Sequence, residues 1–278
     1  MKPAILYNNK SRKLILIYGS SGAGKTVFGG SSMLHEDYNS LFVLAVEKEG
    51  AKSINTTLNV QPIVYPIDTL GEIEEALVWL KRREQTQRAW ENETNPEKKE
   101  KFETELKKQE EPLLGSIPEK PTIIKTIMLD SVTAYQKMAM NEIMGNSDKL
   151  MISSIKKSQY DDWGKNKQLL SSLINRLQAI PNMNIICTAL AQEINDGEKI
   201  LPAMEGSFRE SIGAYFDIVG YLEKRYIPNE KKTIRVIFWE DPKTVSKNRF
   251  LNTDEEKYLQ NPSIITMEEQ IKKQEGKK

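Results

Sequence analysis

The chain of 278 residues carries 40 Lys and Arg against 39 Asp and Glu, which leaves a formal net charge of +1. This balance excludes a polybasic coat protein, so any binding to nucleic acid must come from local patches of charge. Cys187 and His35 are the only residues of their kinds, which excludes an intramolecular disulfide and a multi-histidine zinc site.

The first 13 residues lack both the apolar stretch and the small-residue cleavage site of a signal peptide. No run in the chain approaches the roughly 20 apolar residues that a membrane span requires. We therefore expect a cytoplasmic protein with no membrane contact. One core with appendages is expected, because single cores stop growing near roughly 250 to 300 residues.

Short apolar runs alternate along the chain with longer segments of helical spacing. The runs that predict strands are 14–18, 41–46, 63–65, 123–129, 184–190, 217–226 and 233–239. Apolar residues at helical spacing predict helices over 70–90 and 161–180. The last two strands flank Pro228-Asn229-Glu230, which indicates an antiparallel hairpin. These patterns together predict an α/β fold, with a mostly parallel sheet flanked by helices and an antiparallel C-terminal hairpin.

The stretch 81–120 differs from the rest of the chain, because it holds ten Lys and Arg and ten Asp and Glu. Pro96 and Pro112 interrupt it. So charged a segment offers no apolar face to bury, and we expect a solvated helical hairpin or a disordered insertion. The tail that begins at Met267 has a similar composition and is expected to fray.

The first strand leads directly into Gly19-Ser20-Ser21-Gly22-Ala23-Gly24-Lys25-Thr26, which fits the pattern G-x-x-x-x-G-K-[ST]. Glycines let successive N–H groups point at phosphate oxygens, and the N-terminus of the following helix favours negative charge. In such a loop Lys25 reaches the β- and γ-phosphates, and the Thr26 hydroxyl binds magnesium. These eight residues therefore predict a site for ATP and Mg²⁺.

Polar residues follow three further strands, at the sheet edge where parallel sheets bind ligands. Asp130 ends its strand and is the expected carboxylate partner for magnesium. Glu47 and Glu49 lie at alternate positions, so on an extended chain both point to one side, where either would orient the attacking water. Thr188, and Gln192 beyond the strand end, are placed to sense the γ-phosphate, although an ordinary strand-end hydroxyl explains Thr188 almost equally well.

Three more motifs accompany the P-loop. They are Glu47-Lys48-Glu49-Gly50, Tyr160-Asp161-Asp162-Trp163-Gly164 and the stretch 215–222, Tyr-Phe-Asp-Ile-Val-Gly-Tyr-Leu. The order of the P-loop, the strand before Glu47, the strand before Asp130 and the strand before Gln192 resembles that of the RecA-like ATPases. The three motifs resemble in detail the phage nucleotide-binding proteins of the RecA-type single-strand annealing group. The resemblance covers roughly 13–251 without the charged insertion. It implies an ATPase core over 1–251, an insertion at about 83–120 and a C-terminal extension over 252–278.

The resemblance also implies roles for individual residues. Glu49 corresponds to the water-activating glutamate, and Glu47 stands where an aspartate is more usual. Lys247 and Arg249 correspond to two cations that reach a neighbouring subunit's nucleotide, although Ser-Lys-Asn-Arg-Phe is also an ordinary basic turn. Two loops, about 144–160 and 193–211, correspond to the segments that bind single-stranded DNA. Their basic residues are Lys149, Lys156, Lys157, Lys199 and Arg209.

The function implied is ATP hydrolysis coupled to single-stranded DNA in phage-type recombination, by annealing or strand exchange, in the host cytoplasm if a phage encodes the protein. The expected partners are single-stranded DNA, further copies of the chain in a ring or filament with nucleotide at the subunit interface, and a single-stranded DNA-binding protein. Few cations line the loops, so DNA binding should need several subunits and be salt-sensitive. The alternative is a P-loop kinase for a nucleotide or small molecule, whose lid would carry Arg82, Arg83 and Arg88.

Overall fold

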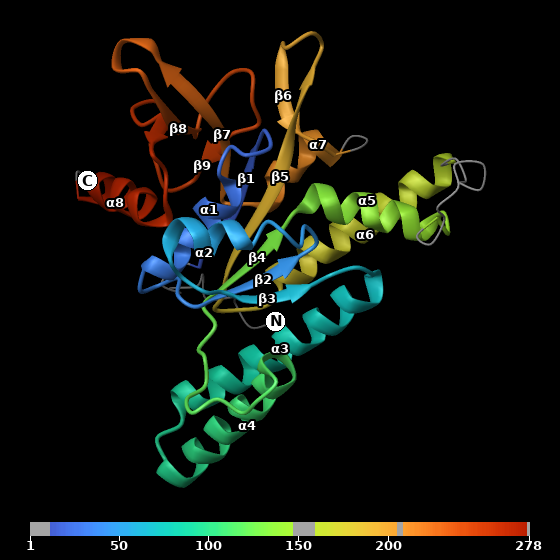
Figure 1. The fold of residues 1–278 in the computed structure, drawn as a ribbon, viewed down its shortest axis with the longest axis vertical. Helices are drawn as coiled ribbons and strands as arrows, with labels where there is room; N and C mark the ends of the chain where they lie inside the picture. Colours follow the sequence, from blue (N-terminus) through green and yellow to red (C-terminus); the bar gives the residue numbers. More distant parts are fainter. Residues whose placement is uncertain (1–11, 147–158, 205–207, 277–278) are drawn as a thin grey trace, which may run out of the picture.

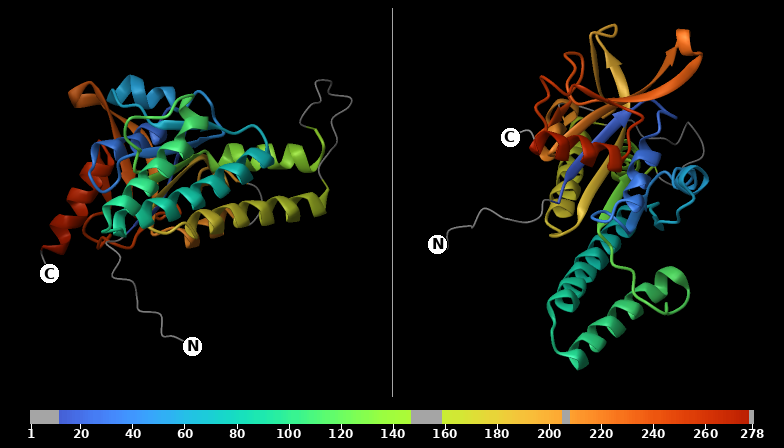
Figure 2. Two further views of the ribbon diagram at one scale, coloured as in Figure 1. Left: turned by 90° about the horizontal axis from the view of Figure 1, so that it is seen from below. Right: turned by 90° about the vertical axis from the view of Figure 1, so that its left-hand side faces the viewer.

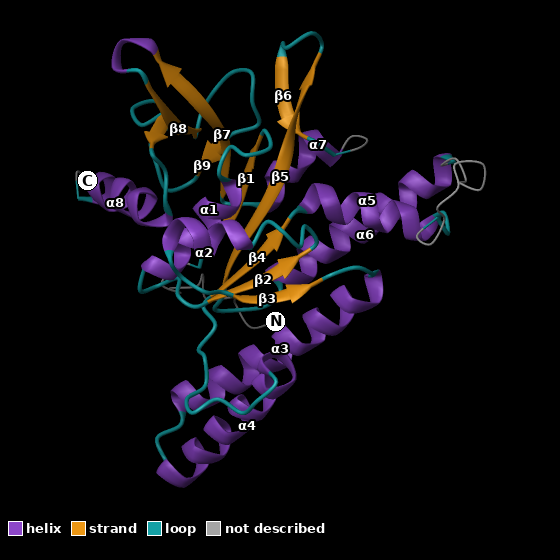
Figure 3. Ribbon diagram, in the orientation of Figure 1, coloured by secondary structure: helices purple, strands orange, loops and turns teal. Residues whose placement is uncertain are grey.

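The computed structural model describes residues 12–146, 159–204 and 208–276, which build a ten-stranded mixed sheet with helices on both faces (Figures 1 and 3). The strands are β1 (Leu14–Gly19), β2 (Leu41–Ala45), β3 (Ile63–Pro66), β4 (Thr126–Asp130), β5 (Asn184–Ile194), β6 (Lys199–Pro202), β7 (Ile218–Ile227), β8 (Lys232–Phe238), β9 (Lys247–Asn248) and β10 (Tyr258–Gln260). The α-helices are α1 (Lys25–Gly30), α2 (Lys52–Leu58), α3 (Leu70–Asn92), α4 (Pro96–Leu114), α5 (Val132–Ile143), α6 (Tyr160–Gln178), α7 (Phe208–Ser211) and α8 (Ile264–Glu275). Short 3₁₀ turns are η1 (Ser31–Leu34), η3 (Ile212–Tyr215) and η4 (Pro228–Glu230).

The order of strands across the sheet is β10-β8-β7-β1-β5-β4-β2-β3, with β6 paired to β5 and β9 paired to β7. The strands from β7 to β3 in this order are parallel to their neighbours, whereas β8 and β10 run antiparallel. The predicted α/β sheet with an antiparallel C-terminal hairpin is thus confirmed. Strand β5 lies between β1 and β4, so a single strand separates the P-loop strand from the strand that ends in Asp130.

The central strands are buried on both faces, which explains why they read as continuous apolar runs. On one face Leu16 and Tyr18 of β1 lie in a core formed with α3, α5 and α6. On the other face Ile15 and Ile17 join a core formed with α1, α2 and α8. The sheet is therefore covered by packed helices on both faces.

The charged insertion is a helical hairpin of α3 and α4 that extends away from the sheet (Figures 1 and 2). Thr69 begins α3 with a capping box, and Asn95 caps α4 with Pro96 at its first turn. The expectation that this segment buries no face is wrong, because Leu106 and the Arg83–Glu110 ion pair are fully buried between the helices. A buried ion pair thus joins α3 to α4, which the composition did not indicate.

Helix α8 also departs from the expectation of a frayed tail. Met267 and Ile271 are buried in the core on the α1 face, and the Ser31 hydroxyl accepts a hydrogen bond from the N–H of Ile264 at 2.8 Å. The apolar spacing of this helix decides its packing despite the many charges around it. None of the helices in the described part of the chain is long and apolar enough to cross a bilayer.

Candidate active site

The carboxyl ends of β1, β2, β4 and β5 bring most of the predicted site residues to one edge of the sheet. In register, Ala45 at the end of β2 pairs with Asp130 at the end of β4. Thr188 of β5 lies beside Ile17 of β1, two residues before Gly19. Because parallel strands end at a common edge, residues more than a hundred positions apart in the chain come into contact here.

The P-loop joins β1 to α1 and holds Lys25 at its inner side. The Lys25 side chain is buried, and its Nζ donates hydrogen bonds to the carbonyl oxygens of Gly19 at 3.0 Å and Ser20 at 2.9 Å. Burial lowers the pKa of Lys25, and the nearby carboxylates of Asp130 and Glu47 oppose that shift. The loop therefore presents one ammonium group close to two acids.

Asp130 accepts a hydrogen bond at each of its carboxylate oxygens. Thr26 Oγ1 donates to Oδ2 at 2.9 Å, and Thr188 Oγ1 donates to Oδ1. Asp130 is only 3% exposed. Burial raises its pKa, while the hydrogen bonds from Thr188 and Thr26 lower it. The predicted magnesium residues Thr26 and Asp130 are thus in direct contact, and Thr188 orients the aspartate from behind.

Glu47 lies on the same side of the site as Asp130. Ser131 Oγ donates a hydrogen bond to Glu47 Oε1, and the Glu47 N–H donates to the Asp130 carbonyl oxygen at 2.9 Å. A Cβ atom on Gly50 would lie 2.6 Å from Asp130 Oδ2, so only glycine leaves room for the carboxylate. Ser131 and Gly50 were not predicted as site residues. Their positions directly after Asp130 and Glu49 could have indicated them as site residues.

The expectation that Glu47 and Glu49 point to one side is wrong, because strand β2 ends at Ala45 and the following residues form a turn. The N–H of Gly50 donates to the Glu47 carbonyl oxygen at 3.0 Å, which closes this turn. Glu49 instead pairs with Lys52, and its side chain is 79% exposed. Of the two acids, Glu47 is the one in contact with the residues around Asp130.

Gln192 does not follow the end of its strand as expected. Strand β5 continues to Ile194 and pairs with β6, so Gln192 is a strand residue opposite Leu201. It lines a cavity of about 550 Å³ together with Thr133, Lys137 and Trp163. The sequence pattern missed this extension because the outer half of β5 is polar and half exposed.

Lys247 and Arg249 lie away from this chain's own P-loop, beside the start of β7. Lys247 pairs with Val219, and Arg249 Nη1 forms an ion pair with Asp217 Oδ1 at 2.9 Å. Burial and the neighbouring Arg249 cation lower the pKa of Lys247. The geometry therefore does not favour a contact between these two cations and a nucleotide in the P-loop of the same chain.

The basic residues proposed for DNA binding divide into two groups. Lys149, Lys156 and Lys157 lie outside the described residues. Lys199 is exposed at the start of β6, and Arg209 lies in α7 beside Phe208, which is buried as a packing residue, as expected. The hairpin of β5 and β6, which includes Lys199, extends beyond the sheet edge (Figure 1).

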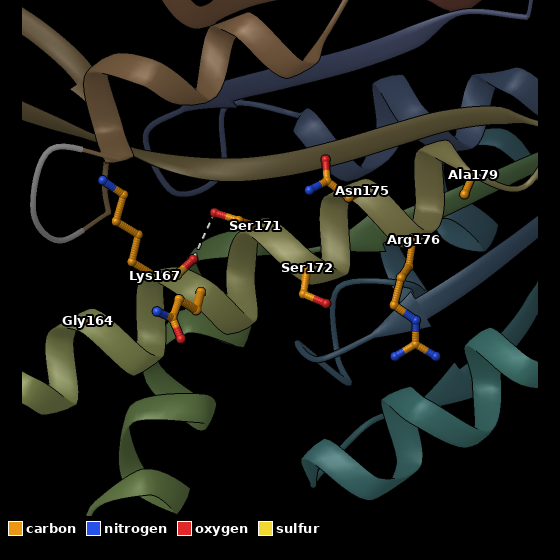
Figure 4. A pocket seen from close by; sticks show the side chains of 8 residues that line it. Gly164, Lys167, Ser171, Ser172, Asn175, Arg176 and Ala179 are labelled. Atoms are coloured by element: carbon orange, nitrogen blue, oxygen red, sulfur yellow. Dashed lines mark hydrogen bonds between the residues drawn. The ribbon is translucent and has the colours of Figure 1, made fainter.

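A shallow hollow of about 720 Å³ runs along the outer side of α6 (Figure 4). Its lining includes Lys167, Ser171 and Arg176, and the Ser171 hydroxyl donates to the Lys167 carbonyl oxygen at 2.9 Å. Arg176 turns towards α3, where it pairs with Glu74. No residue of the P-loop lines this hollow, so it is separate from the site around Asp130.

Comparison with known proteins matches most of the chain to a family model. Residues 11–250 match the family AAA_24, described as an AAA domain. A search of curated proteins finds no match. The crystal structure of flagellar accessory protein FlaH from Methanocaldococcus jannaschii is 13% identical, with a TM-score of 0.35 over 85% of this chain and 79% of that one. That likeness is too weak to support an argument, but the family match and the strand order confirm the predicted RecA-like P-loop NTPase fold.

Proposed function

Because the chain belongs to the AAA-domain family of P-loop NTPases, we propose that it binds ATP with magnesium at Gly19–Thr26 and hydrolyses it. One observation carries this proposal: the hydroxyls of Thr26 and Thr188 converge on the two oxygens of Asp130. This arrangement joins the P-loop to the strand that supplies the acid. Hydroxyl and carboxylate oxygens therefore lie together beside the loop that would bind the phosphates.

The residues at this place fit magnesium. Mg²⁺ prefers oxygen ligands and is held in phosphate-binding enzymes by one or two carboxylates together with the substrate's phosphates. Thr26 Oγ1 and Asp130 Oδ2 are such oxygens and lie 2.9 Å apart. Thr26 and Asp130 are therefore the residues that would hold the ion. Magnesium bound there would neutralise charge on the phosphates.

Glu47 is the residue we assign to the attacking water, in preference to Glu49. In hydrolysis the water oxygen bonds to the γ-phosphorus, the bond from that phosphorus to the bridging oxygen breaks, and the water's proton passes to a base. The Ser131 hydroxyl fixes one oxygen of Glu47 and leaves the carboxylate oriented towards the Asp130 side. Lys25 supplies positive charge for the phosphate oxygens.

The coupling to DNA is the further part of the proposal: the protein acts as an oligomer on single-stranded DNA in phage-type recombination. Strand β5 supports it, because it runs without a break from Thr188 at the site to Ile194 in the protruding hairpin. A change at Asp130 can therefore pass along β5 to Ile194, which pairs with the exposed Lys199 of β6. Lys247 and Arg249, which lie away from their own P-loop, are the proposed contacts to the nucleotide of a neighbouring subunit.

The kinase alternative has less support. A lid needs arginines that can reach the phosphates, but Arg83 is buried against Glu110, and Arg82 and Arg88 pair with Glu105 and Glu84. The α3–α4 hairpin also extends from the end of the sheet opposite to the β5–β6 hairpin (Figure 1). The insertion therefore lacks both the free arginines and the position of a lid.

The test is ATP hydrolysis with magnesium, measured with and without single-stranded DNA. Lys25→Ala should abolish hydrolysis, while Lys52→Ala, which removes an exposed lysine, should leave it unchanged. Stimulation by DNA that weakens as salt is raised would support the coupling. Hydrolysis that DNA does not alter would contradict the recombination role, and phosphate transfer to a nucleoside monophosphate would instead favour the kinase.

A further inference from the structure

The β7–β8 hairpin places two cations directly opposite each other. Lys224 and Arg235 are cross-strand partners in the antiparallel register, two residues beyond the pair Leu222 and Ile237. Side chains alternate along a strand, so Lys224 and Arg235 share a face with Leu222 and Ile237. These two apolar residues lie in the same buried cluster as Ala23 of the P-loop. The paired cations are therefore on the face of the hairpin that covers the P-loop.

Both cations reach the loop itself. Arg235 Nε donates a hydrogen bond to the Ala23 carbonyl oxygen at 3.1 Å. A Cβ atom on Gly24 would lie 2.8 Å from the same nitrogen and would displace the Arg235 side chain, and the φ of 109° at Gly24 favours glycine. Lys224 Nζ lies 3.6 Å from where a Cβ on Gly22 would be. The hairpin thus brings two positive side chains to a loop built for phosphate.

Neither cation is neutralised within the described part of the protein. Lys224 and Arg235 form no ion pair there, whereas the adjacent Arg225, on the opposite face, pairs with Glu223. Like charges directly opposite each other destabilise a sheet. An unneutralised pair at this position is readily explained if an anion binds between the hairpin and the P-loop, and the anion that a P-loop holds is a polyphosphate.

We propose that Lys224 and Arg235 bind the phosphate chain of the nucleotide held by the P-loop of the same chain and thereby select nucleotides with several phosphates. This inference rests on the proposed ATP site and adds two phosphate-binding residues to it. The Nε hydrogen bond to Ala23 uses one of the five donors of the guanidinium and fixes its plane, so the other donors remain for phosphate oxygens. Unlike Lys247 and Arg249, these cations serve their own subunit's nucleotide.

Equilibrium binding of ATP, ADP and AMP tests the proposal without depending on hydrolysis. Lys224→Ala and Arg235→Ala should each weaken ATP binding about tenfold, the size expected for a lost charge-assisted hydrogen bond. The loss should be smaller for ADP and absent for AMP. Inorganic tripolyphosphate should compete with ATP less well on the variants than on the wild type.

Arg225→Ala is the matched control, because it removes the same charge from the same strand on the face away from the P-loop. Arg235→Lys keeps the cation, so it should retain part of the ATP affinity that Arg235→Ala loses. Thermal unfolding of each variant checks the fold. ATP affinity equal to that of Arg225→Ala, or an equal loss for AMP, would overturn the proposal, as would a loss of DNA binding with ATP binding intact.

The outcome separates this inference from the proposed function. If the wild type binds ATP but DNA does not stimulate hydrolysis, the recombination role fails and the binding comparison still decides the role of the two cations. If the wild type does not bind ATP at all, both fail together. Binding that Lys25→Ala abolishes and Lys224→Ala does not change would retain the ATP site and reject the hairpin cations.

Discussion

Two neighbouring acids, Glu47 and Glu49, show how a local turn decides chemistry at the scale of single residues. Both were predictable as candidates, since they follow a buried strand at the sheet edge. Their orientation was not, because it depends on whether the strand continues past Ala45, and the turn closed by the Gly50 N–H is a contact that alternation of side chains does not reveal. The same holds for Thr188, whose hydroxyl meets Asp130 only through the pairing of β5 between β1 and β4.

This geometry predicts different effects of the two glutamates. Glu47→Gln should lower the turnover rate of ATP hydrolysis about a hundredfold or more, because a carboxamide cannot accept the water's proton. Glu49→Gln, which changes an exposed side chain, should leave turnover within about twofold. Single-turnover hydrolysis and ATP binding measured together separate the two, because ATP should still bind to both variants. The reverse ranking would assign the water to Glu49.

The lone cysteine has a second residue-scale consequence. Cys187 is fully buried in β5, and burial raises its pKa to about 12. Since the thiolate is the reactive form, the native protein should not react with Ellman's reagent at pH 8 on the time scale of minutes. One thiol should appear when the protein is unfolded in guanidinium. Rapid reaction of the native chain would show that the centre of the sheet opens.

At the scale of elements, the α3–α4 hairpin depends on a buried ion pair. The Arg83 guanidinium contacts Glu110 and the carbonyl oxygens of Leu106 and Thr122, and Glu110 Oε1 accepts a hydrogen bond from the Thr122 N–H at 2.7 Å. The hairpin is thereby joined to the segment that leads into β4. Composition allowed either a helical hairpin or a disordered insertion. It did not indicate this pair, since nothing in a charged sequence shows which two charges will be buried.

Removing one member of this pair should be costly. Glu110→Ala leaves the Arg83 cation buried without its carboxylate, and the free energy of unfolding should fall by about 3 to 5 kcal/mol. Arg82→Ala, which removes an exposed partner of Glu105, should cost no more than about 1 kcal/mol. Urea unfolding followed by circular dichroism measures both. Equal small effects would mean that the hairpin does not unfold together with the core.

For the C-terminal hairpin, the sequence predicts the local structure but not its position in the fold. The turn at Pro228-Asn229-Glu230 was recognisable, and a hairpin centred there sets the register that places Lys224 opposite Arg235. The cation pair was thus within reach of the sequence. Its position above the P-loop was not, because that depends on β7 pairing in parallel with β1. Helix α8 is likewise held by packing against segments that are distant in the sequence.

At the scale of the whole molecule, the proposed role of Arg249 can be tested by mixing subunits. Lys25→Ala protein and Arg249→Ala protein should each be inactive alone. In a mixed oligomer, some sites combine an intact P-loop from one subunit with an intact Arg249 from the next. ATPase activity above the sum of the separate variants is therefore expected if the cation acts in trans.

The control for this experiment is a mixture of Lys25→Ala with Thr26→Ala. Both changes lie in the same P-loop, so mixed oligomers contain no repaired site and no recovery is expected. Recovery only with the Arg249 variant would support an interface that shares its nucleotide. Full activity of Arg249→Ala alone would show that Arg249 acts only through its ion pair with Asp217.

The central place of β1 in the sheet has a consequence for synthesis on the ribosome. This strand is made well before its two neighbours in the sheet, β5 and β7, and β7 ends at Ile227. The P-loop therefore emerges long before the strands that hold it in place. Until β5 and β7 have been translated, the nascent protein cannot complete its nucleotide site and exposes apolar strands to which chaperones can bind.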